Sequence, residues 1–563
     1  MKVVDRFRSP ASGLTTLDNA PPLVRCFVLL QANGKVSMSQ SSVSAIGRRT
    51  LLASGTALGL AAGLPPAEAA SRTKYVTANN NPYDILDPHQ VFDIGRIAIR
   101  LNMYDSLVRW VDNPPKLDMW LAEKVDISDD GLVYSFTLHP NVKFHDGAPL
   151  TADDVVWSME RILAIKKGAY GLFSDVVKPG STKALDKLRV QFTLTKPFAV
   201  FMPVLSELWV VNSKLVQSKV KDGDWGADWL TRNEAGSGGY KLKRFDPAIG
   251  FQVERNLDHF KPFGPGAIDD ADFRVSMETA TRVLGMIKGE FQTTDGYMPA
   301  EQVQRMKASG NVWFKEAESI RTFYFIINHA KTPMNDVNLR RALCCMFDYD
   351  GFNNDILGGT VVRNPGIIPN PMWGAPKDLT GYSYDIDKAK WYLSQVKEKL
   401  RPLQIGAMAG YPQSEQGAQM LQAGAAKAGL DIKIVAEPYT TIAPKLDDPD
   451  RAHDLVPLWR SAYFADPHNW TGYIYNSKNF KAGNASFYKN VRVDELTDQA
   501  LAITDQEKRR PLYEEVSRIL VDDAAGLFVN NTKFFGPYAK SVKSVRFCPI
   551  GDTQDIRWIE MNS

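Results

Sequence analysis

The sequence predicts a mixed α/β protein built from at least two lobes. The chain has 563 residues, more than a single hydrophobic core usually organises. Strand and helix patterns alternate along it, and a strand–helix–strand unit over 403–439 implies a parallel crossover. Hydrophobic residues make up 44% of the chain and charged residues 23%, proportions that are ordinary for a globular protein.

A hairpin that leads into a capped helix is predicted over 132–163. Hydrophobic and polar side chains alternate over 134–139, the period of a half-buried strand. A turn follows, and 142–144 is expected to be a short return strand. Thr151 and Asp154 then have the spacing of a capping box, in which each side chain accepts a hydrogen bond from an early backbone N–H. Apolar residues at helical spacing continue from there.

The strand–helix–strand unit is the second strongly patterned segment. Strands at 403–408 and 431–435 flank a helix at 414–428, which Gly429 is expected to end. Because a helix joins the two strands, they are expected to lie parallel in one sheet with a right-handed connection. Further helical patterns fall at 337–349, 387–396 and 512–520.

Residues 1–69 have the features of an export leader. A pair of arginines, Arg48 and Arg49, precedes an apolar run over 51–64, and Ala67-x-Ala69 follows as a cleavage site. The run is 14 residues long, shorter than the roughly 18–20 residues that span a bilayer. The paired arginines resemble a twin-arginine signal, so we expect export to the periplasm and cleavage after Ala69.

The start of this leader is expected at Met38. Translation from there gives an n-region of ordinary length, and residues 1–37 would then be an upstream mis-start or a dispensable tail. No cysteine lies near Ala69, so no lipid anchor is predicted. Mass spectrometry of the precursor tests this start, and a precursor that begins at Met1 would contradict it.

The basic charge of the chain belongs to this leader. The whole chain has 67 Lys/Arg and 64 Asp/Glu. Residues 1–69 hold seven of the basic and three of the acidic residues, which leaves 60 basic and 61 acidic residues in 70–563. The mature chain therefore gives no indication of a basic face for nucleic acid.

The cysteines do not form a disulfide framework. Cys26 lies in the leader, which leaves Cys344, Cys345 and Cys548, an odd number with two members adjacent in a helical pattern. Buried thiols are the favoured interpretation. A bridge between Cys345 and Cys548 stays open at this point.

The sequence contains no constellation that indicates catalysis or a resident metal. The seven histidines do not pair at metal-ligand spacing, and no GxSxG motif occurs. Ser218-x-x-Lys221 and Ser394-x-x-Lys397 have the form of a serine–lysine nucleophile pair, but this two-residue pattern is common by chance. No catalytic residue, metal or cofactor is predicted.

Several motifs resemble one known family. The most specific match runs over 129–156, where Val142-Lys-Phe-His145-Asp-Gly147 lies just before the capping box. Other matches are found at 86–89, 102–108, 236–242, 338–343 and 510–513. Together they span nearly all of 73–563 and resemble the extracellular solute-binding proteins of family 5, the dipeptide-, oligopeptide- and nickel-binding components of ABC importers.

The resemblance implies a two-lobed periplasmic-binding-protein fold that closes on a ligand like a clam shell. Lobe I would be discontinuous, with an attached subdomain, and two hinge strands would cross to lobe II. The expected boundaries are 73–110, 237–318 and 536–563 for lobe I, 111–236 for the subdomain and 319–535 for lobe II. The hinge strands are expected near 320–328 and 534–545.

The function that this resemblance implies is capture of a peptide-like small solute and its delivery to an ABC permease in the inner membrane. The protein would act in the periplasm as a monomer, without nucleic acid. The same fold could instead bind a non-peptide solute such as an opine, an oligosaccharide or a metal chelate. A periplasmic hydrolase, and a receptor or chaperone with this fold, are the other classes.

The segment WRSAYFADPHNW, which runs from Trp459 to Trp470, is predicted to contact the ligand. Aromatic rings give large, stiff contact areas, and tyrosine and tryptophan add a polar group. We expect Trp459, Tyr463 and Phe464 to form an apolar contact. Asp466 is expected to hold the loop or to bind a cationic group of the ligand. The alternative is that the two tryptophans only anchor the loop in the core.

One position in this segment departs from the pattern of the resemblance. In the peptide-binding members, an acidic residue four positions before the proline holds the α-amino group of the peptide. Here that position, four before Pro467, is Tyr463. The departure leaves the identity of the ligand open.

Overall fold

The computed structural model describes residues 72–562, apart from 81–82, 297, 481–482 and 552–553. By its contacts the chain divides into Met1–Ala69 and one compact unit, Ala70–Ser563. The leader, its expected start at Met38 and its cleavage after Ala69 all lie outside the described residues.

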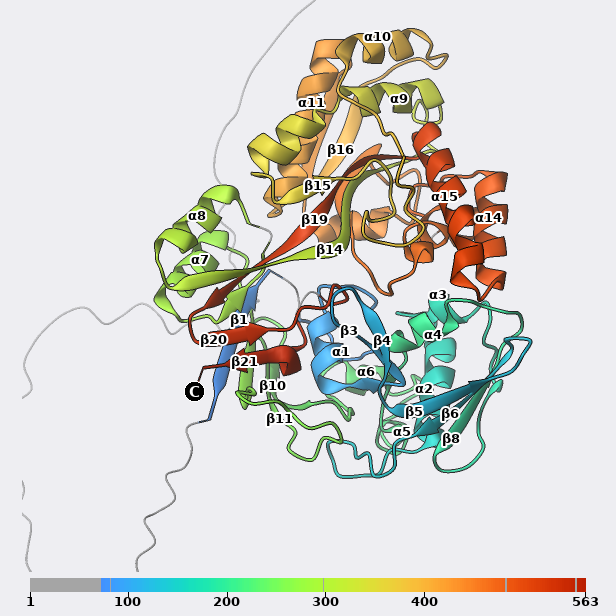
Figure 1. Ribbon diagram of the computed structural model, residues 1–563, viewed down its shortest axis with the longest axis vertical. Coiled ribbons are helices and arrows are strands. Elements are labelled where there is room, and N and C mark those ends of the chain that lie inside the picture. Colours follow the sequence, from blue (N-terminus) through green and yellow to red (C-terminus); the bar gives the residue numbers. More distant parts are fainter. Residues whose placement is uncertain (1–71, 81–82, 297, 481–482, 552–553, 563) are drawn as a thin grey trace, which may run out of the picture. The chain divides into compact units, whose positions relative to one another are not determined.

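A mixed sheet runs through both lobes of the compact unit (Figure 1). Among the described residues it has 11 strands, ten of them in one continuous order with β15 added beside β19. The order is β10 (Tyr240–Asp246), β11 (Gly250–Arg255), β12 (Asp270–Val275), β1 (Lys74–Asn79), β13 (Thr293–Thr294), β19 (Gly526–Ala539), β14 (Val312–Ile327), β18 (Leu455–Arg460), β16 (Leu403–Met408) and β17 (Ile432–Glu437), with β15 at Val361–Arg363. Strands β10 to β13 belong to lobe I, and β18, β16 and β17 belong to lobe II.

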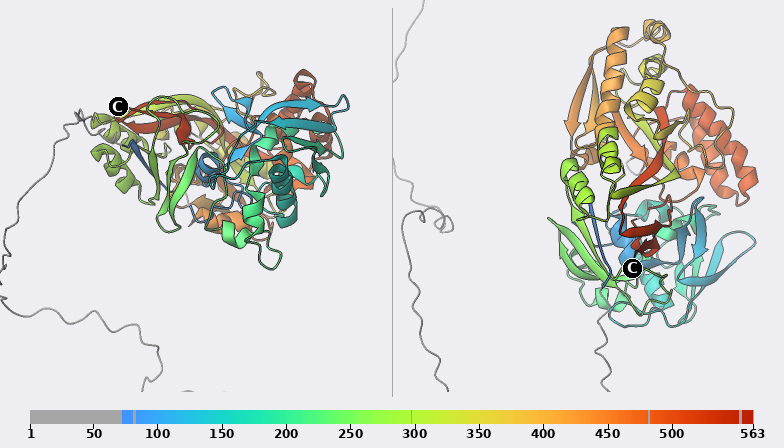
Figure 2. Two further views of the ribbon diagram at one scale, coloured as in Figure 1. Left: turned by 90° about the horizontal axis from the view of Figure 1, so that it is seen from below. Right: turned by 60° about the vertical axis from the view of Figure 1, so that its left-hand side comes forward.

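Two long antiparallel strands, β14 and β19, connect the lobes (Figures 1 and 2). Their pairing extends from Val312 opposite Ala539 to Ile326 opposite Gly526. The register shifts between Ala317 and Arg321, so the ladder is interrupted midway along the pair. This irregularity lies where the first hinge strand was expected to begin.

The predicted crossover in lobe II is confirmed. Strands β16 and β17 are parallel, with Leu403 opposite Ile432, and helix α11 (Pro412–Ala428) connects them. Gly429 ends the helix in the left-handed conformation at φ 83°, as expected for a residue without a Cβ. The carboxyl ends of β16 and β17 therefore lie at one edge of the sheet.

The other predicted helices of lobe II are present. They are α9 (Val337–Met346), α10 (Ile386–Ser394) and α15 (Gln506–Asp522), with α14 (Val491–Ala502) packed against α15. Cys344 and Cys345 lie buried in α9 and both are free thiols. The Cys345–Cys548 bridge that the sequence left open is therefore not formed. No helix in the described part of the chain has the length and apolarity needed to cross a bilayer.

A second, four-stranded antiparallel sheet forms the subdomain that packs beside lobe I. Its strands are β5 (Ala122–Ile127), β6 (Val133–Leu138), β8 (Arg189–Thr193) and β7 (Thr182–Ala184). Helix α2 (Ala152–Ile165) follows with the predicted capping box, and the backbone N–H of Thr151 donates to the Asp154 carboxylate at 2.8 Å. The alternating residues of β6 bury one face in the subdomain core.

The return strand predicted at 142–144 is wrong. Strand β6 pairs with β5 and β8, which are distant in sequence from this segment. Instead, 142–144 folds back on the residues just after it: the Phe144 N–H donates to the Ala148 carbonyl at 2.8 Å, and the Leu150 N–H donates to the Val142 carbonyl at 2.9 Å. The physical reason is that two strands from elsewhere in the chain occupy both edges of β6.

Candidate ligand-binding site

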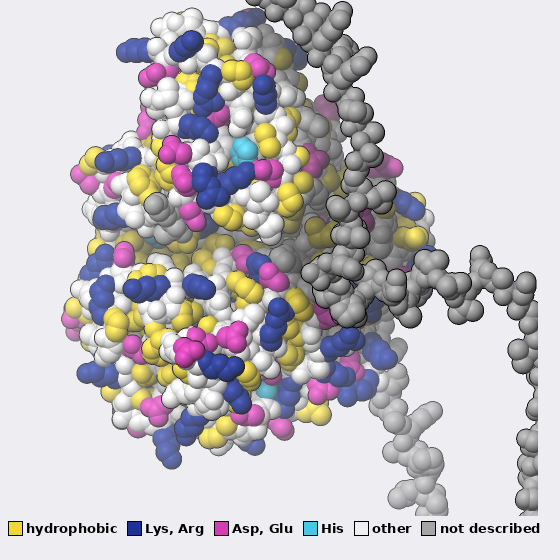
Figure 3. Space-filling model, turned by 180° about the vertical axis from the view of Figure 1, so that it is seen from behind, with side chains coloured by type: hydrophobic (Ala, Val, Ile, Leu, Met, Phe, Trp, Pro, Cys, Tyr) yellow, Lys and Arg dark blue, Asp and Glu magenta, His cyan; other side chains and the backbone are white. Residues whose placement is uncertain are grey.

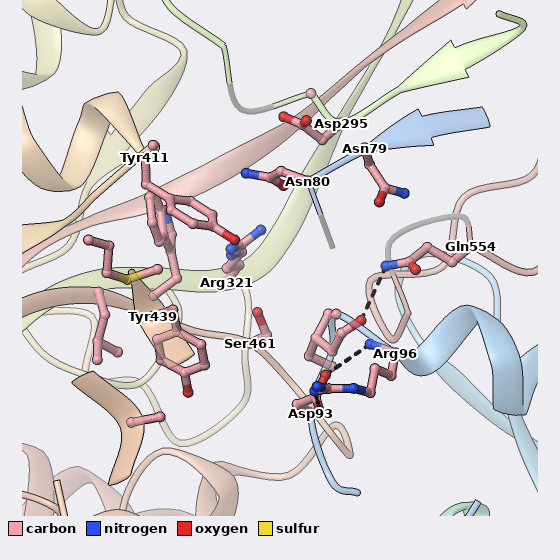
Figure 4. A pocket seen from close by; sticks show the side chains of 18 of the residues that line it. Asn79, Asn80, Asp93, Arg96, Asp295, Arg321, Tyr411, Tyr439, Ser461 and Gln554 are labelled. Atoms are coloured by element: carbon pink, nitrogen blue, oxygen red, sulfur yellow. Dashed lines mark hydrogen bonds and ion pairs between the residues drawn. The ribbon is translucent and has the colours of Figure 1, made fainter. Parts of the chain in front are cut away.

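A cavity of about 790 Å³ lies between the two lobes. Its lining comes from the ends of sheet strands and the loops that follow them, in both lobes (Figure 4). A cavity of this size is typical for a small-molecule site, which combines apolar walls with a few placed polar groups.

The wall that lobe I contributes is mainly polar. Its labelled members in Figure 4 are Asn79, Asn80, Asp93, Arg96, Asp295 and Gln554. The Arg96 guanidinium lies 2.7 Å from the Asp93 carboxylate and 2.6 Å from that of Asp84. Burial lowers the pKa of Arg96, but the hydrogen bond to Asp84 and the attraction of Asp93 outweigh it and raise that pKa above its usual value. Arg96 is thus a permanently charged, rigidly held group.

Asp295 on the same wall is also paired. Its carboxylate lies 3.2 Å from the guanidinium of Arg282, a side chain that is almost fully buried and donates to the carbonyls of Ser276 and Met277. The described acidic groups of the lining, Asp93 and Asp295, therefore each have an arginine beside them.

The wall that lobe II contributes is aromatic and carries a cation. The parallel strands β16 and β17 end at Met408 and Glu437, and the loops after them present Tyr411 and Tyr439 to the cavity. The carboxyl edge of parallel strands is the usual place for a ligand crevice in α/β folds. Burial raises the pKa of Tyr411, so its hydroxyl is neutral and can donate a hydrogen bond.

Trp459 lies at the centre of this wall. It is the next-to-last residue of β18, it is half-buried, and its ring centroid is 6.1 Å from that of Tyr411. The guanidinium carbon of Arg321 lies 5.0 Å from the Trp459 ring centroid. The predicted contact residue Trp459 thus belongs to the cavity lining, although the prediction that it touches a ligand is untested.

Tyr463 also lines the cavity. Its ring stacks on Phe92 of lobe I, with centroids 3.9 Å apart and planes at 26°. The Arg460 guanidinium lies 5.1 Å from the Tyr463 ring. Burial raises the pKa of Tyr463, and the charge of Arg460 opposes only part of this rise. The side chain at this position is therefore a neutral ring held between a ring and a cation.

Phe464 and Asp466 lie outside the cavity lining. Phe464 is only 1% exposed and packs with the hydrophobic core of the subdomain. Asp466 is buried, accepts the His468 backbone N–H at 3.0 Å and forms a two-pronged pair with Arg509 at 2.8 Å. Trp470 is fully buried. For these three residues the side chain anchors the loop, and the proposed ligand role of Phe464 and Asp466 is not tested by this geometry.

The residues that sequence reasoning missed come from distant segments. Arg321, Asp295 and Arg96 lie on a long strand, a short strand's end and a loop, and nothing in their local sequence distinguishes them from solvated charges. Tyr411 had a usable signal, because it follows Gly410 at the end of a predicted parallel strand, where φ is 81°. A residue that follows a strand in this way is well placed for a ligand crevice.

Groups for other chemistry are not assembled in the described residues. No cluster of three His, Cys, Asp or Glu side chains that could hold a metal is present among them. The Ser218 hydroxyl donates to the Leu215 carbonyl and the Ser394 hydroxyl to the Trp391 carbonyl, each at 2.7 Å. Both serines thus stabilise helix ends.

The sequence profile of the bacterial extracellular solute-binding proteins, family 5 (middle region), matches residues 116–482. The chain belongs to this family. Among its relatives, the probable D,D-dipeptide-binding periplasmic protein DdpA of Escherichia coli (strain K12) is 31% identical over 511 residues, which cover 89% of this chain and 96% of that protein. The dipeptide-binding protein of the same organism is 28% identical, over 82% of this chain and 90% of that protein.

A solved structure shows the same fold. The ABC transporter-associated periplasmic binding protein DppA from Helicobacter pylori, in complex with the peptide STSA, superimposes with a TM-score of 0.80 at 23% identity, over 87% of this chain and 99% of that one. This likeness confirms the two-lobed α/β fold that the sequence predicted. The family 5 chain studied here is thus a substrate-binding protein by family, and its cavity lies between its lobes.

Proposed function

We propose that this family 5 protein is the periplasmic substrate-binding component of an ABC importer that captures a peptide-like small solute. The observation that carries the proposal is the 790 Å³ cavity, whose lining comes from both lobes. A D,D-dipeptide-binding relative and a peptide complex of the same fold support the peptide-like class. The solute is captured without chemical change and delivered to a permease in the inner membrane.

Closure would proceed by rotation of the lobes about β14 and β19. The lobes in this proposal are 73–110 with 237–318 and 536–563, the subdomain 111–236, and 319–535. A solute that touches both walls stabilises the closed form through contacts that the open form lacks. Moving the population from mostly open to mostly closed takes about 5 kcal/mol of such preference. The interrupted register between Ala317 and Arg321 provides a compliant point in the connection.

The route to the periplasm is part of the same proposal. A twin-arginine signal at Arg48 and Arg49 exports the chain, cleavage follows Ala69, and no lipid anchor is attached. The mature protein acts as a monomer without enzymatic turnover or nucleic acid. Translation from Met38 completes this proposal, and N-terminal sequencing of precursor and mature forms tests it.

A non-peptide solute is the second candidate, because Tyr463 stands where an acidic residue would hold a peptide amino group. An opine, an oligosaccharide or a metal chelate would fit this change. The deciding experiment is to purify the protein from its native periplasm, denature it and identify the released small molecules by mass spectrometry. A peptide-like molecule at near-stoichiometric amount supports the main proposal, and a sugar or metal chelate contradicts it.

Binding of candidates is then measured by thermal shift. A ligand at 100 times its dissociation constant adds about 2.7 kcal/mol to the free energy of unfolding. Turnover of any candidate that disappears in Ser218→Ala or Ser394→Ala would instead support a hydrolase.

A further inference from the structure

Positive charge exceeds negative charge on the described lining of the cavity. That lining includes the four arginines Arg96, Arg282, Arg321 and Arg460 and the two aspartates Asp93 and Asp295. Each aspartate is paired with an arginine, at 2.7 Å for Asp93 with Arg96 and 3.2 Å for Asp295 with Arg282. A partly enclosed site with an excess of cations attracts an anionic solute.

Arg460 is committed to the protein itself. Its guanidinium donates to the Asn469 carbonyl at 3.0 and 3.2 Å and to the Asn469 side-chain oxygen at 3.2 Å. It also lies about equally close to two rings, 5.1 Å from that of Tyr463 and 5.0 Å from that of Tyr473. These contacts hold the loop after β18 in place.

Arg321 has the geometry of an anion receptor. Its backbone lies in β14 opposite Thr532 of β19, so its position is set by two long strands. The guanidinium lies over the Trp459 ring at 5.0 Å, an arrangement that uses the face of the group. Its N–H groups lie in the plane of the guanidinium, and a carboxylate binds to such a planar edge with two parallel hydrogen bonds.

Tyr411 and Ser461 lie close to this arginine in the close-up view (Figure 4). The charge of Arg321 lowers the pKa of Tyr411 against the larger effect of burial, which places the two groups within electrostatic reach. Both residues line the cavity and carry hydroxyl groups. An anion held by Arg321 would therefore find additional hydrogen-bond donors beside it.

The opposite requirement, a place for an ammonium group, is not met at Tyr463. The ring is covered by Phe92 on one side, and the Arg460 cation lies 5.1 Å from it. An ammonium group there would face a neutral residue and a like charge, which is unfavourable in a partly desolvated site. A solute does not need an amino group for this part of the cavity.

We infer that Arg321 selects the solute by its carboxylate, and that a free amino group on the solute is not required for binding. The inference rests on the proposed function, since it concerns what the same cavity accepts. It names the solute class as a small carboxylic acid with an apolar body, such as an N-blocked dipeptide or another acidic solute of that size.

Four forms of one dipeptide test the two parts separately. D-alanyl-D-alanine and L-alanyl-L-alanine are each measured free, N-acetylated, C-amidated and blocked at both ends, by calorimetry on the mature protein. Acetylation is expected to change Kd by less than threefold, whereas amidation weakens binding at least 30-fold. Equal affinity of acid and amide, or loss of binding on acetylation, would overturn the inference while leaving peptide capture intact.

Variants at Arg321 assign the effect to this side chain. Arg321→Gln is expected to bring the acid forms to the affinity of the amides, and Arg321→Lys to restore part of the difference. Arg305→Gln, which removes the same charge from an exposed position on helix α8 (Ala300–Ala308), is the matched control and should change nothing. Unfolding temperatures of all three variants show whether the fold is kept.

A pair of non-peptide probes separates this inference from the proposed function. Galacturonate and galactose differ by a carboxylate at one ring position. If no dipeptide form binds but galacturonate binds more tightly than galactose in an Arg321-dependent way, peptide capture fails and the carboxylate rule stands. If neither series shows Arg321-dependent preference for the acid, the inference is wrong.

Discussion

At the scale of single residues, the lobe II wall consists of rings that are already held before a solute arrives. Trp459 lies 5.2 Å from Phe323 and 6.1 Å from Tyr411, measured between ring centroids. A ring restrained by such neighbours loses little freedom on binding, so most of its contact energy contributes to affinity. Tyr463 is restrained in the same way by Phe92.

Replacing either ring should weaken binding without unfolding the protein. Tyr463→Ala and Trp459→Ala are each expected to cost about 1–3 kcal/mol of binding free energy, the value of a buried aromatic contact. Calorimetry with the solute released from the purified protein measures this. Trp391→Ala is the control, because Trp391 is 58% exposed and lies outside the cavity lining. Unchanged affinity in both test variants would show that the solute binds elsewhere.

The Asp466–Arg509 pair should matter for stability more than its surface counterparts. Both side chains are at least 95% buried, so Asp466→Asn leaves a buried guanidinium without its anion and is expected to cost about 3–5 kcal/mol. Urea unfolding at neutral pH measures the loss. Asp378→Asn breaks the pair with Arg518, where the Asp378 side chain is 77% exposed, and should cost at most about 1 kcal/mol. Equal losses would contradict the role given to burial.

At the scale of elements, local sequence signals were sufficient for the helices and for the crossover. The capping box of Thr151 and Asp154 and the helix end at Gly429 depend on neighbours within a few residues. The return strand at 142–144 could not be judged in this way. Whether it pairs with β6 depends on β5 and β8, and the hydrogen bonds of those strands come from residues up to about 60 positions away.

The capping box gives a test at this scale. Thr151→Ala removes the hydroxyl that caps α2 and is expected to destabilise the protein by about 1 kcal/mol. Chemical denaturation followed by circular dichroism measures the change. Thr441→Ala, at an exposed position of the short helix α12 (Tyr439–Ile442), is expected to stay within about 0.5 kcal/mol. A loss at Thr441 as large as at Thr151 would argue against the cap.

At the scale of the whole molecule, subdomain and lobe II touch at several places besides the cavity. Phe464 of lobe II packs into the core of the subdomain, and the Ala199 N–H donates to the Leu501 carbonyl at 2.8 Å. On the face seen in Figure 3, basic and acidic side chains are interspersed over both lobes. The contacts between lobes are therefore local and largely apolar, and they would have to separate when the protein opens.

Closure should be visible in solution. Small-angle scattering of the mature protein is expected to give a smaller radius of gyration with saturating solute than without it, because the solute favours the state in which both walls make contact. The same measurement on Arg321→Gln at equal solute concentration should show less compaction. An unchanged radius with a solute that calorimetry shows to be bound would contradict the hinge proposal.

The site could be predicted from sequence only in part, and its geometry shows why. Trp459 and Tyr463 belong to a short aromatic segment that is conspicuous on its own. Arg321 and Asp295 join them only because β14 and β13 lie beside β19 in the sheet order. That order is a property of the complete fold, so no local pattern could have placed those charges at the cavity.

The position of β19 also determines when the protein can fold. Its partners are β14, β13 and β15, yet its last residue, Ala539, emerges from the ribosome 24 residues before the end of the 563-residue chain. The central ladder therefore cannot form until synthesis is nearly complete, and its pairings close loops of more than 200 residues between β14 and β19. Such non-local contacts make folding slow, which gives the export machinery of the cell a nascent chain that stays unfolded throughout most of translation.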